Sequence, residues 1–463
     1  MVPYEKFALF RGVPRVRGTN LGRREKQSFS GVSKIGWFVF PPSTCYYLKQ
    51  AGKMPELFYV LTPQQAYSQL EPFLSFSGRV ERIATTRALG RVLAEEVFAP
   101  FPLPSFPCSA MDGYAVQAED TYGSSETSPI YLHLVGEVLI GGPALLSLSP
   151  GEAALIHTGS LLPGQANAVV MVEHTRQVDT STIEVTRPVA VGENVLQRGE
   201  DIPQGKALLP QGHLLRPQDI GGLLAQGITS VSVSQPPRVA IISSGDELVL
   251  PQIEPGVGQV RDINSYTLAG LTLEAGGIPL PQPIVRDDFE ALREAAERAL
   301  AAADIVVFSG GSSVSARDMT AQIINSLGSP GILVHGVAIK PGKPTILAVA
   351  GQKPIFGLPG NPVSAIITFE LFVTRAIYRL NGCNKPPAPH IFSARLTHNI
   401  PSVSGREDYV PVRVEEREEG LWVEPIFGKS NFISTLIKAD GMVQVPLDKG
   451  GLKAGDEVKV RFF

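Results

Sequence analysis

The segment from residue 337 to residue 380 constrains the fold of this chain more than any other part. It reads VAIKPGKPTILAVAGQKPIFGLPGNPVSAIITFELFVTRAIYRL. A short apolar run ends at Ile355 and Phe356, a turn rich in glycine and proline follows, and apolar residues then recur at helical spacing. Asn361 is expected to cap this helix by accepting a backbone amide of its first turn, and Pro362 suits the first helical position. The segment therefore predicts a buried strand, a tight turn and a helix.

The strand, the turn and the helix N-terminus together predict an anion-binding crevice. Free backbone amides and the positive end of the helix dipole would point into it. Lys340 and Lys343 lie just upstream, on a loop stiffened by proline, and would add two positive charges. A purely structural interpretation is also open, because turns of this kind often only connect a strand to a helix. The nearby lysines favour anion binding.

Composition limits the class of protein. At about 150 residues per domain, the 463 residues suggest about three domains. Hydrophobic residues make up 43% and charged residues 18%, which indicates a globular chain. The net charge of -3 argues against general nucleic-acid binding. No apolar run reaches the ~18 to 20 residues needed to span a bilayer, so no membrane association is expected.

Reactive side chains narrow the chemistry. Cys45, Cys108 and Cys383 show neither metal-ligand spacing nor a paired disulfide framework, which favours a reducing, cytoplasmic setting. The seven histidines form no cluster, and no Ser-His-Asp order can be argued. The glycine-rich loops match neither the Walker A pattern nor G-x-G-x-x-G.

Residues 1–57 are predicted to form a basic N-terminal extension. The first 53 residues hold ten Lys or Arg against two Asp or Glu, so the remainder carries a net charge of -11. No apolar core follows the first basic residues, which argues against a cleavable secretory signal. A transit peptide remains open, but a flexible tail, or a true start at Met54, is the favoured interpretation.

The chain up to residue 235 divides into a helical and a β-rich stretch. Two helices are expected within residues 61–98, the first capped by Thr62 and the second running from 86 to 97. A proline-rich run then leads to Asp112, which precedes a glycine and would ordinarily mark a turn. Residues 129–235 alternate short β-rich runs with turns, which predicts a β-domain.

Residues 238–383 alternate strands with helices, which predicts a doubly wound, mostly parallel sheet. Helices are expected to begin near Asn264, at a capping-box-like start around Asp288, and at Asp318. The loops SGDEL, SGGSSVSARD and GLPGNP each follow a strand, so all three should lie at the one edge where such sheets bind ligands. After the linker KPPAP, residues 390–463 read as strands of a small β-barrel or sandwich, with Arg406 and the loop 430–434 as polar features.

The α/β edge combines groups that bind anions with groups that bind cations. Asp246, Glu247 and Asp318 favour a divalent cation, and carboxylates beside phosphates usually share Mg²⁺. The combination suggests phosphoryl or nucleotidyl chemistry. The alternative is that these carboxylates only cap helices.

Seven motifs occur in an order that resembles a known family. They are SAMDGYAV, TGSLLPGQANAVVMVE, RGEDI, SSGDEL, SGGSSVSARD, IKPGKP and GLPGNPVSA. Over about residues 58–463 the chain is similar to the molybdopterin molybdenumtransferases, the MoeA and gephyrin E-domain family. The resemblance implies an α/β multidomain protein: a mostly parallel α/β sandwich domain of the MoaB/MogA kind, a β-rich domain, a small helical linker domain and a C-terminal β-barrel. The implied limits are 58–98 with 202–236 for the linker domain, 99–201 for the β-rich domain, 237–384 for the α/β domain and 385–463 for the barrel.

The resemblance also implies an activity. The family inserts molybdate into adenylylated molybdopterin, with Mg²⁺ assisting, and releases AMP to give molybdenum cofactor. It is typically homodimeric, with each site between the β-domain of one subunit and the α/β domain of the other. Further partners it suggests are the molybdopterin adenylyltransferase and molybdoenzyme apoproteins.

Site residues carry over from the matching motifs. The implied catalytic residues are Asp112, Glu247 and Asp318, and the implied metal ligands are Asp246, Glu247 and Asp318. The implied substrate-binding residues are Thr158, Asp201, Ser309, Gly310, Gly311, Lys340, Lys343, Pro359, Gly360, Asn361, Pro362, Ser364, Arg406 and Ser430.

The loop after Gly310 departs from the family pattern, which is usually GGVSVG followed by an acid. Here Ser312, Ser315 and Ala316 replace valine, glycine and the acid. A positive φ at Ser315 would be strained, and the missing carboxylate at Ala316 would weaken a metal site. A catalytically degenerate paralogue that binds molybdopterin or acts as a scaffold is therefore the alternative. A nucleotide-pyrophosphate hydrolase that shares only the α/β domain is a third hypothesis.

Overall fold

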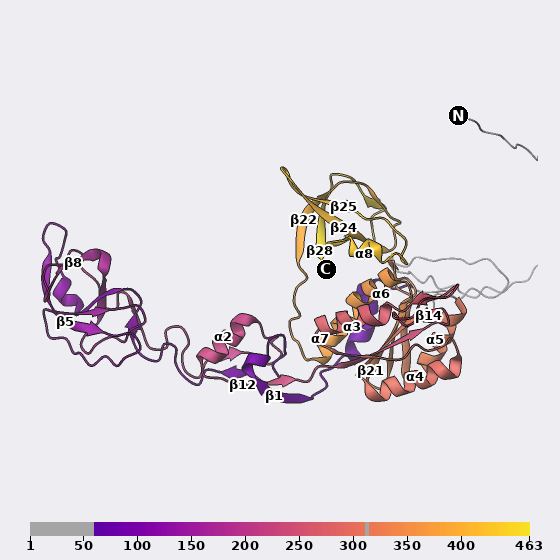
Figure 1. Ribbon diagram of the computed structural model, residues 1–463, viewed down its shortest axis with the longest axis horizontal. Helices are drawn as coiled ribbons and strands as arrows, with labels where there is room; N and C mark the ends of the chain where they lie inside the picture. Colours follow the sequence, from indigo (N-terminus) through magenta and orange to yellow (C-terminus); the bar gives the residue numbers. More distant parts are fainter. Residues whose placement is uncertain (1–59, 311–313) are drawn as a thin grey trace, which may run out of the picture. The chain divides into compact units, whose positions relative to one another are not determined.

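A computed structural model of the chain describes residues 60–310 and 314–463, with the side chains of 314–317 left out (Figure 1). All of these residues belong to one compact unit of the chain. In the described part of the chain, no helix is both long and apolar enough to cross a membrane. The predictions for residues 1–57 and for Met54 and Cys45 lie outside the described residues.

A six-stranded sheet forms the α/β domain. Its strands, in spatial order, are β16 (Ile278–Pro281), β13 (Arg238–Ser244), β17 (Ile305–Gly310), β21 (Lys353–Pro359), β20 (Ile346–Ala350) and β18 (Pro330–His335). The first four run parallel, and β20 is antiparallel to both of its neighbours, β21 and β18, so β20 alone runs in the opposite direction. Only Gly351 and Gln352 separate β20 from β21, which is too short for a parallel crossover. The predicted mostly parallel sheet is confirmed, and the hairpin explains the reversed direction of β20.

Helices cover both faces of this sheet. Alternate strand residues point to opposite faces, so Ile241 of β13 joins one buried cluster and Ile242 joins the other. The first face is covered by α3 (Asn264–Glu274) and by α6 (Pro362–Thr368), a π-helical turn (Phe369–Val373) and α7 (Thr374–Leu380). The second face is covered by α4 (Phe289–Ala302) and α5 (Val314–Ser326).

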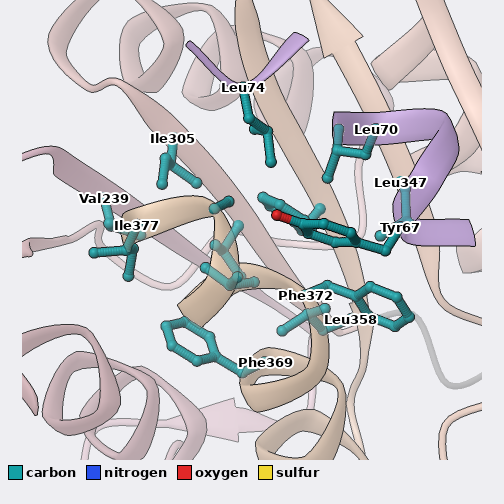
Figure 2. Close-up of a cluster of buried hydrophobic side chains, with 14 of the residues drawn as sticks. Tyr67, Leu70, Leu74, Val239, Ile305, Leu347, Leu358, Phe369, Phe372 and Ile377 are labelled. Atoms are coloured by element: carbon teal, nitrogen blue, oxygen red, sulfur yellow. The ribbon is translucent and has the colours of Figure 1, made fainter. Parts of the chain in front are cut away.

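A helix from the start of the described chain completes the first face. Helix α1 (Pro63–Leu70) begins as predicted at Thr62, whose hydroxyl accepts a hydrogen bond from the Gln65 amide. Figure 2 shows its Tyr67 and Leu70 in the same buried cluster as Phe372 of the π-helical turn. This helix therefore packs against the core of the α/β domain.

The helix starts of the α/β domain follow the predictions with one exception. Helix α3 begins at Asn264, and the Asp288 side chain caps α4 by accepting from the Ala291 amide. Helix α5 begins at Val314 rather than at Asp318, so that prediction is wrong. Ser315 thus has ordinary right-handed helical backbone, and the strain considered for it does not arise.

The linker region joins two segments that are far apart in sequence. Strand β1 (Val80–Ala84) pairs with β12 (Ser230–Ser234), and β2 (Val97–Phe98) pairs with β11 (Ala207–Leu209). Helix α2 (Pro217–Ala225) lies between β11 and β12 in the sequence. The helix predicted for 86–97 is wrong. Only Thr85–Arg87 forms a 3-10 turn, and Val92 and Leu93 make bridges to Leu214 and Val233. Pairing with a distant segment has overridden the local helical preference.

The β-rich domain is a single curled sheet. It contains β4 (Gly113–Val116), β5 (Ile130–Val138), β6 (Glu152–Ile156), β7 (Ala168–Met171), β8 (Thr175–Gln177) and β9 (Thr182–Val185), in the order β7-β4-β6-β5-β9-β8. Two further short strands, β3 (Cys108–Ser109) and β10 (Val195–Leu196), pair beside it. Residues 110–112 form a bend, so Asp112 lies where the chain changes direction as expected, while Gly113 already belongs to β4.

A closed five-stranded barrel forms the C-terminal region, as predicted. Its strands are β22 (Ile391–Leu396), β24 (Glu407–Arg417), β25 (Gly420–Pro425), β26 (Gly441–Val445) and β28 (Glu457–Phe462). The ring runs β24-β25-β22-β28-β26 and closes by pairing β26 with β24. Strand β19 (Ile339–Lys340), from the loop before β20, adds to β24 in parallel and joins the barrel to the α/β domain.

Candidate functional site

Three glycine-containing corners meet at the carboxyl ends of the parallel strands. Ser244 at the end of β13 pairs with Gly310 at the end of β17, which pairs with Pro359 at the end of β21. A small pocket lies there, lined in part by Ser244, Gly310 and Pro359, and also by Thr320 and Pro344. The predicted convergence of the loops is confirmed. Gly311 lies outside the described residues.

Backbone rather than side chains forms these corners. Gly310 has φ +155°, and an added Cβ there would lie 2.5 Å from the Ser244 carbonyl oxygen. A Cβ at Gly360 would lie 3.4 Å from the Gly310 Cα, so the second and third corners are in contact. Corners without side chains leave room for other groups to approach their backbone closely.

One buried side chain joins two of the corners. Asn264, at the start of α3, donates from Nδ2 to Ser309 Oγ at 2.8 Å and to the Gly360 carbonyl at 2.9 Å. Its Oδ1 is buried without a partner among the described residues. The sequence singled out Asn264 only as a helix start, because an isolated asparagine gives no local signal of a contact with distant loops.

Two cations from different domains share one buried carboxylate. Asp408 of β24 has a side chain only 4% exposed, and it accepts from Arg406 Nε at 2.8 Å and from Nη2 at 3.4 Å. Lys340 Nζ lies 3.8 Å from the same carboxylate, yet its side chain stays 60% exposed. The structure thus brings Lys340 and Arg406 together and holds their charges at the surface of the site. Lys343 lies exposed in the same loop as Lys340. Asp408 was missed by the sequence analysis.

The start of α6 also receives a residue from the barrel. Asn361 does not accept from an amide of its helix, so the predicted side-chain cap is wrong. Its Nδ2 instead donates to Ser430 Oγ at 2.9 Å, and the Val363 amide donates to the Ser430 carbonyl at 3.2 Å. The free amide of the first turn is satisfied from another domain. Pro359 and Pro362 flank this point, and Ser364 is buried in the first turn.

Acidic residues cluster beside the first corner. The Asp287 amide donates to Asp246 Oδ1 at 3.4 Å. Burial, followed by the charges of Glu247 and Asp246, raises the pKa of Asp287. Asp287 was expected only near a helix start, so its place in this cluster was missed. Asp318 is exposed on α5. Across residues 60–310 and 314–463, no three acidic, His or Cys side chains are arranged to hold a metal, so the predicted metal set stays a prediction.

A second group of predicted residues lies in the β-rich domain. The Asp112 carboxylate accepts from the Thr158 amide at 2.8 Å and from the Thr158 hydroxyl at 3.1 Å. Both hydrogen bonds lower the pKa of Asp112, and the bond from the backbone amide has the larger effect. Asp201 is exposed in a turn near Leu103. In the part of the chain that the structure describes, no hydrogen bond links Asp112 or Asp201 to the α/β corners.

Comparisons with known proteins cover almost all of the described chain. Three family descriptions match in order: the MoeA N-terminal region (domains I and II) over residues 61–227, a probable molybdopterin-binding domain over 240–379, and the MoeA C-terminal region (domain IV) over 393–463.

Relatives match along nearly their full length. A putative molybdopterin biosynthesis protein of Methanocaldococcus jannaschii is 38% identical, over 85% of this chain and 95% of its own. A molybdopterin molybdenumtransferase of Nostoc is 36% identical, over 84% and 90%. Among solved structures, a molybdopterin biosynthesis MoeA protein from Pyrococcus horikoshii is 32% identical with a TM-score of 0.75, over 87% of this chain and 100% of that one. Sequence and fold therefore show that this chain belongs to the MoeA family, whose relatives include the molybdopterin molybdenumtransferases.

Proposed function

We propose that this protein inserts molybdate into adenylylated molybdopterin and releases AMP, which gives molybdenum cofactor. The observation that carries the proposal is the pocket at the strand ends. Residues from the SSGDEL, SGG, IKPGKP and GLPGNP motifs all line it, and the Lys340 and Arg406 charges lie near the same loops. A pocket of backbone corners beside two cations suits a substrate made of phosphates and an oxyanion.

In this proposal, different residues bind different parts of the substrates. Lys340, Lys343 and Arg406 supply positive charge for molybdate, beside the α6 N-terminus where Asn361 and Ser430 meet. The corners at Gly310 and Gly360 hold the pyrophosphate of the nucleotide through their amides. Asp112, kept ionised by Thr158, serves as an acid-base or orienting group.

The acidic cluster fits a divalent cation bound mainly through substrate. Burial, and after it the negative charges of Glu247 and Asp246, raise the pKa of Asp287, and a cation beside these two carboxylates would relieve their repulsion. Mg²⁺ commonly uses one or two carboxylates together with phosphate oxygens and water, so a complete protein ligand set is not required. Bound there, Mg²⁺ would neutralise charge on the phosphates as AMP leaves.

The remaining expectations belong to the same proposal. We infer a homodimer in which Asp112 of one subunit serves the α/β site of the other, and a cytoplasmic location. Functional contact with a molybdopterin adenylyltransferase and with molybdoenzyme apoproteins follows from the place of the reaction between them. The domain limits at residues 57, 98, 201, 236 and 384 are also proposed.

The direct test is release of AMP by the purified protein. Adenylylated molybdopterin, molybdate and Mg²⁺ should give AMP in proportion to enzyme, and tungstate in a parallel reaction tests oxyanion choice. No AMP above background would remove the enzyme hypothesis. Tight binding of the substrate without turnover would favour the scaffold alternative.

A substitution tests the assignment of Asp318. Asp318→Ala should abolish AMP release and leave thermal unfolding unchanged, because the side chain is exposed. Asp448→Ala, at an exposed position in the loop between β26 and β27 (Gly451–Leu452), is the matched control and should keep full activity. Normal turnover by Asp318→Ala would show that its assigned role is wrong.

A further inference from the structure

We propose that Asn264 is a positioning residue that locks the second and third glycine corners together for pyrophosphate binding. The inference rests on the function proposed above, and it assigns a role to a residue that carries no substrate-binding role in that proposal. Asn264 is 8% exposed and lies at the first position of α3, behind the corners.

The geometry gives Asn264 a specific task. Its two Nδ2 protons go to two different segments, one to Ser309 Oγ in β17, just before the Gly310 corner, and one to the Gly360 carbonyl in the turn after β21. A carbonyl oxygen can only accept, so the nitrogen must face Gly360, and this settles the orientation of the amide. A single planar group thereby sets the distance between two strand ends.

Residues next to Asn264 make contacts near the first corner, which follows β13. Asp262 accepts from the Ser265 hydroxyl at 2.5 Å, and Ser243 near the end of β13 contacts Asp262 at 3.3 Å and Ser265 at 2.9 Å. All three are buried. The segment 262–265 therefore contacts the ends of β13, β17 and the turn after β21, and Asn264 is its contact with the last two.

The corners need such a lock because they are made of glycine. Gly310 and Gly360 have no side chains to hold them in place, and backbone amides bind phosphate well only when their positions are preorganised. Loss of the Asn264 amide would leave the corners connected mainly by their strands. Binding of pyrophosphate should then weaken even when the fold is kept.

Hydrogen exchange on the ligand-free protein tests the lock without any assumption about function. In Asn264→Ala, peptides covering 305–310 and 353–361 should exchange faster than in the wild type. Asn381→Ala is the matched control, because Asn381 is a similarly buried amide of the same domain whose Nδ2 donates to the Gly276 carbonyl, at 3.2 Å, and, among the described residues, to no glycine corner. Asn264→Asp keeps the size and removes the donors, so it gives the same readout if the alanine variant folds poorly. Wild-type exchange in both peptides would overturn the proposal.

Binding of ADP, a stable pyrophosphate probe, tests the consequence. Asn264→Ala and Asn264→Asp should bind ADP about tenfold or more weakly, since displaced binding groups lose affinity steeply. Asn381→Ala should bind ADP as the wild type does, even if its melting temperature falls as far. Equal ADP affinity in all variants would contradict the positioning role. If the wild type binds ADP but releases no AMP in the assay above, the proposed function fails while this inference stands or falls on the exchange and ADP results.

Discussion

At the scale of single residues, the close approach of two strands explains a glycine whose role the sequence pattern does not indicate. Gly113 follows Asp112, and the pair looks like a turn, yet Gly113 is a buried strand residue. A Cβ at that position would lie 1.9 Å from the Val170 carbonyl oxygen, so only glycine lets β4 reach β7. The same approach fixes the start of β4, directly after Asp112.

Gly113→Ala should therefore destabilise the protein. Overpacking of this kind costs about 2 kcal/mol, because β4 must move away from β7. Gly221→Ala is the control: Gly221 lies in α2 with nothing within 4 Å of an added Cβ, and alanine there should stabilise the protein by about 0.5 kcal/mol. Urea unfolding measures both. A Gly113→Ala protein as stable as the wild type would show that the strands adjust freely.

Thr158→Val tests the pairing of Thr158 with Asp112. The change keeps the backbone hydrogen bond to Asp112 and removes the hydroxyl bond, so the pKa of Asp112 should rise from its lowered value. A carboxylate with a lowered pKa keeps its charge to lower pH, so activity in the variant should begin to fall at a higher pH than in the wild type. The pH profile of AMP release measures this shift, with melting temperature as the check on folding. An unchanged acidic limb would argue against Asp112 as the titrating group.

At the scale of elements, the helix after the third corner contains a buried acid. Glu370 lies in the π-helical turn between α6 and α7, and its side chain is 11% exposed. Arg461 Nη2 of β28 lies 3.1 Å from its carboxylate. Burial raises the pKa of Glu370, the Arg461 charge opposes this, and the Glu274 charge of α3 adds to it. The π-helical turn thus contacts the barrel through the Glu370–Arg461 pair, and the charge of Glu370 in this pair depends on pH.

Glu370→Gln should change how stability depends on pH. In the wild type, the folded state holds a proton on Glu370 at pH values where the unfolded state has lost it, so stability falls as pH rises above the ordinary pKa of 4.5. Glutamine is neutral throughout, so the variant should gain stability relative to the wild type progressively as pH rises from about 5 upward. Urea unfolding across this range measures the difference, with exposed Glu418→Gln as control. A difference that does not change with pH would contradict the expectation.

At the scale of the whole molecule, the site depends on chain segments that are far apart in sequence. Lys340 of the α/β domain shares Asp408 with Arg406, and β19 pairs with the barrel strand β24. Asn361 and Ser430 meet across the same pair of domains. The part of the proposed site that would bind molybdate therefore forms only when the barrel and the α/β domain are docked.

The proposed shared site of a homodimer makes a prediction about mixtures. Asp112→Asn and Asp318→Ala should each be inactive alone. After the two are unfolded together and refolded, mixed dimers should contain one site with both natural residues, restoring about a quarter of the wild-type sites. AMP release by the mixture measures this, with each variant refolded alone as control. No recovery in a mixture shown to contain mixed dimers would place both residues in one subunit's site.

The sequence by itself determined the elements whose signals are local. The strand, turn and helix around residues 353–380, the helix caps at Thr62 and Asp288, and the three glycine loops at one sheet edge all follow from residue type and spacing. The order of the motifs was enough to indicate the family. These features hold because propensity, capping and strand direction act within a few residues.

Only the tertiary structure decided contacts between distant segments. Residues 92 and 93, predicted to be helical, form β-bridges instead. Asn361 bonds to Ser430 rather than to an amide of its own helix. Asn264, Asp287 and Asp408 lie at the site although no sequence pattern indicated it. A buried amide or carboxylate takes whichever partner folding brings near, because leaving it without one is costly. That choice depends on packing over the whole domain, which no local pattern records.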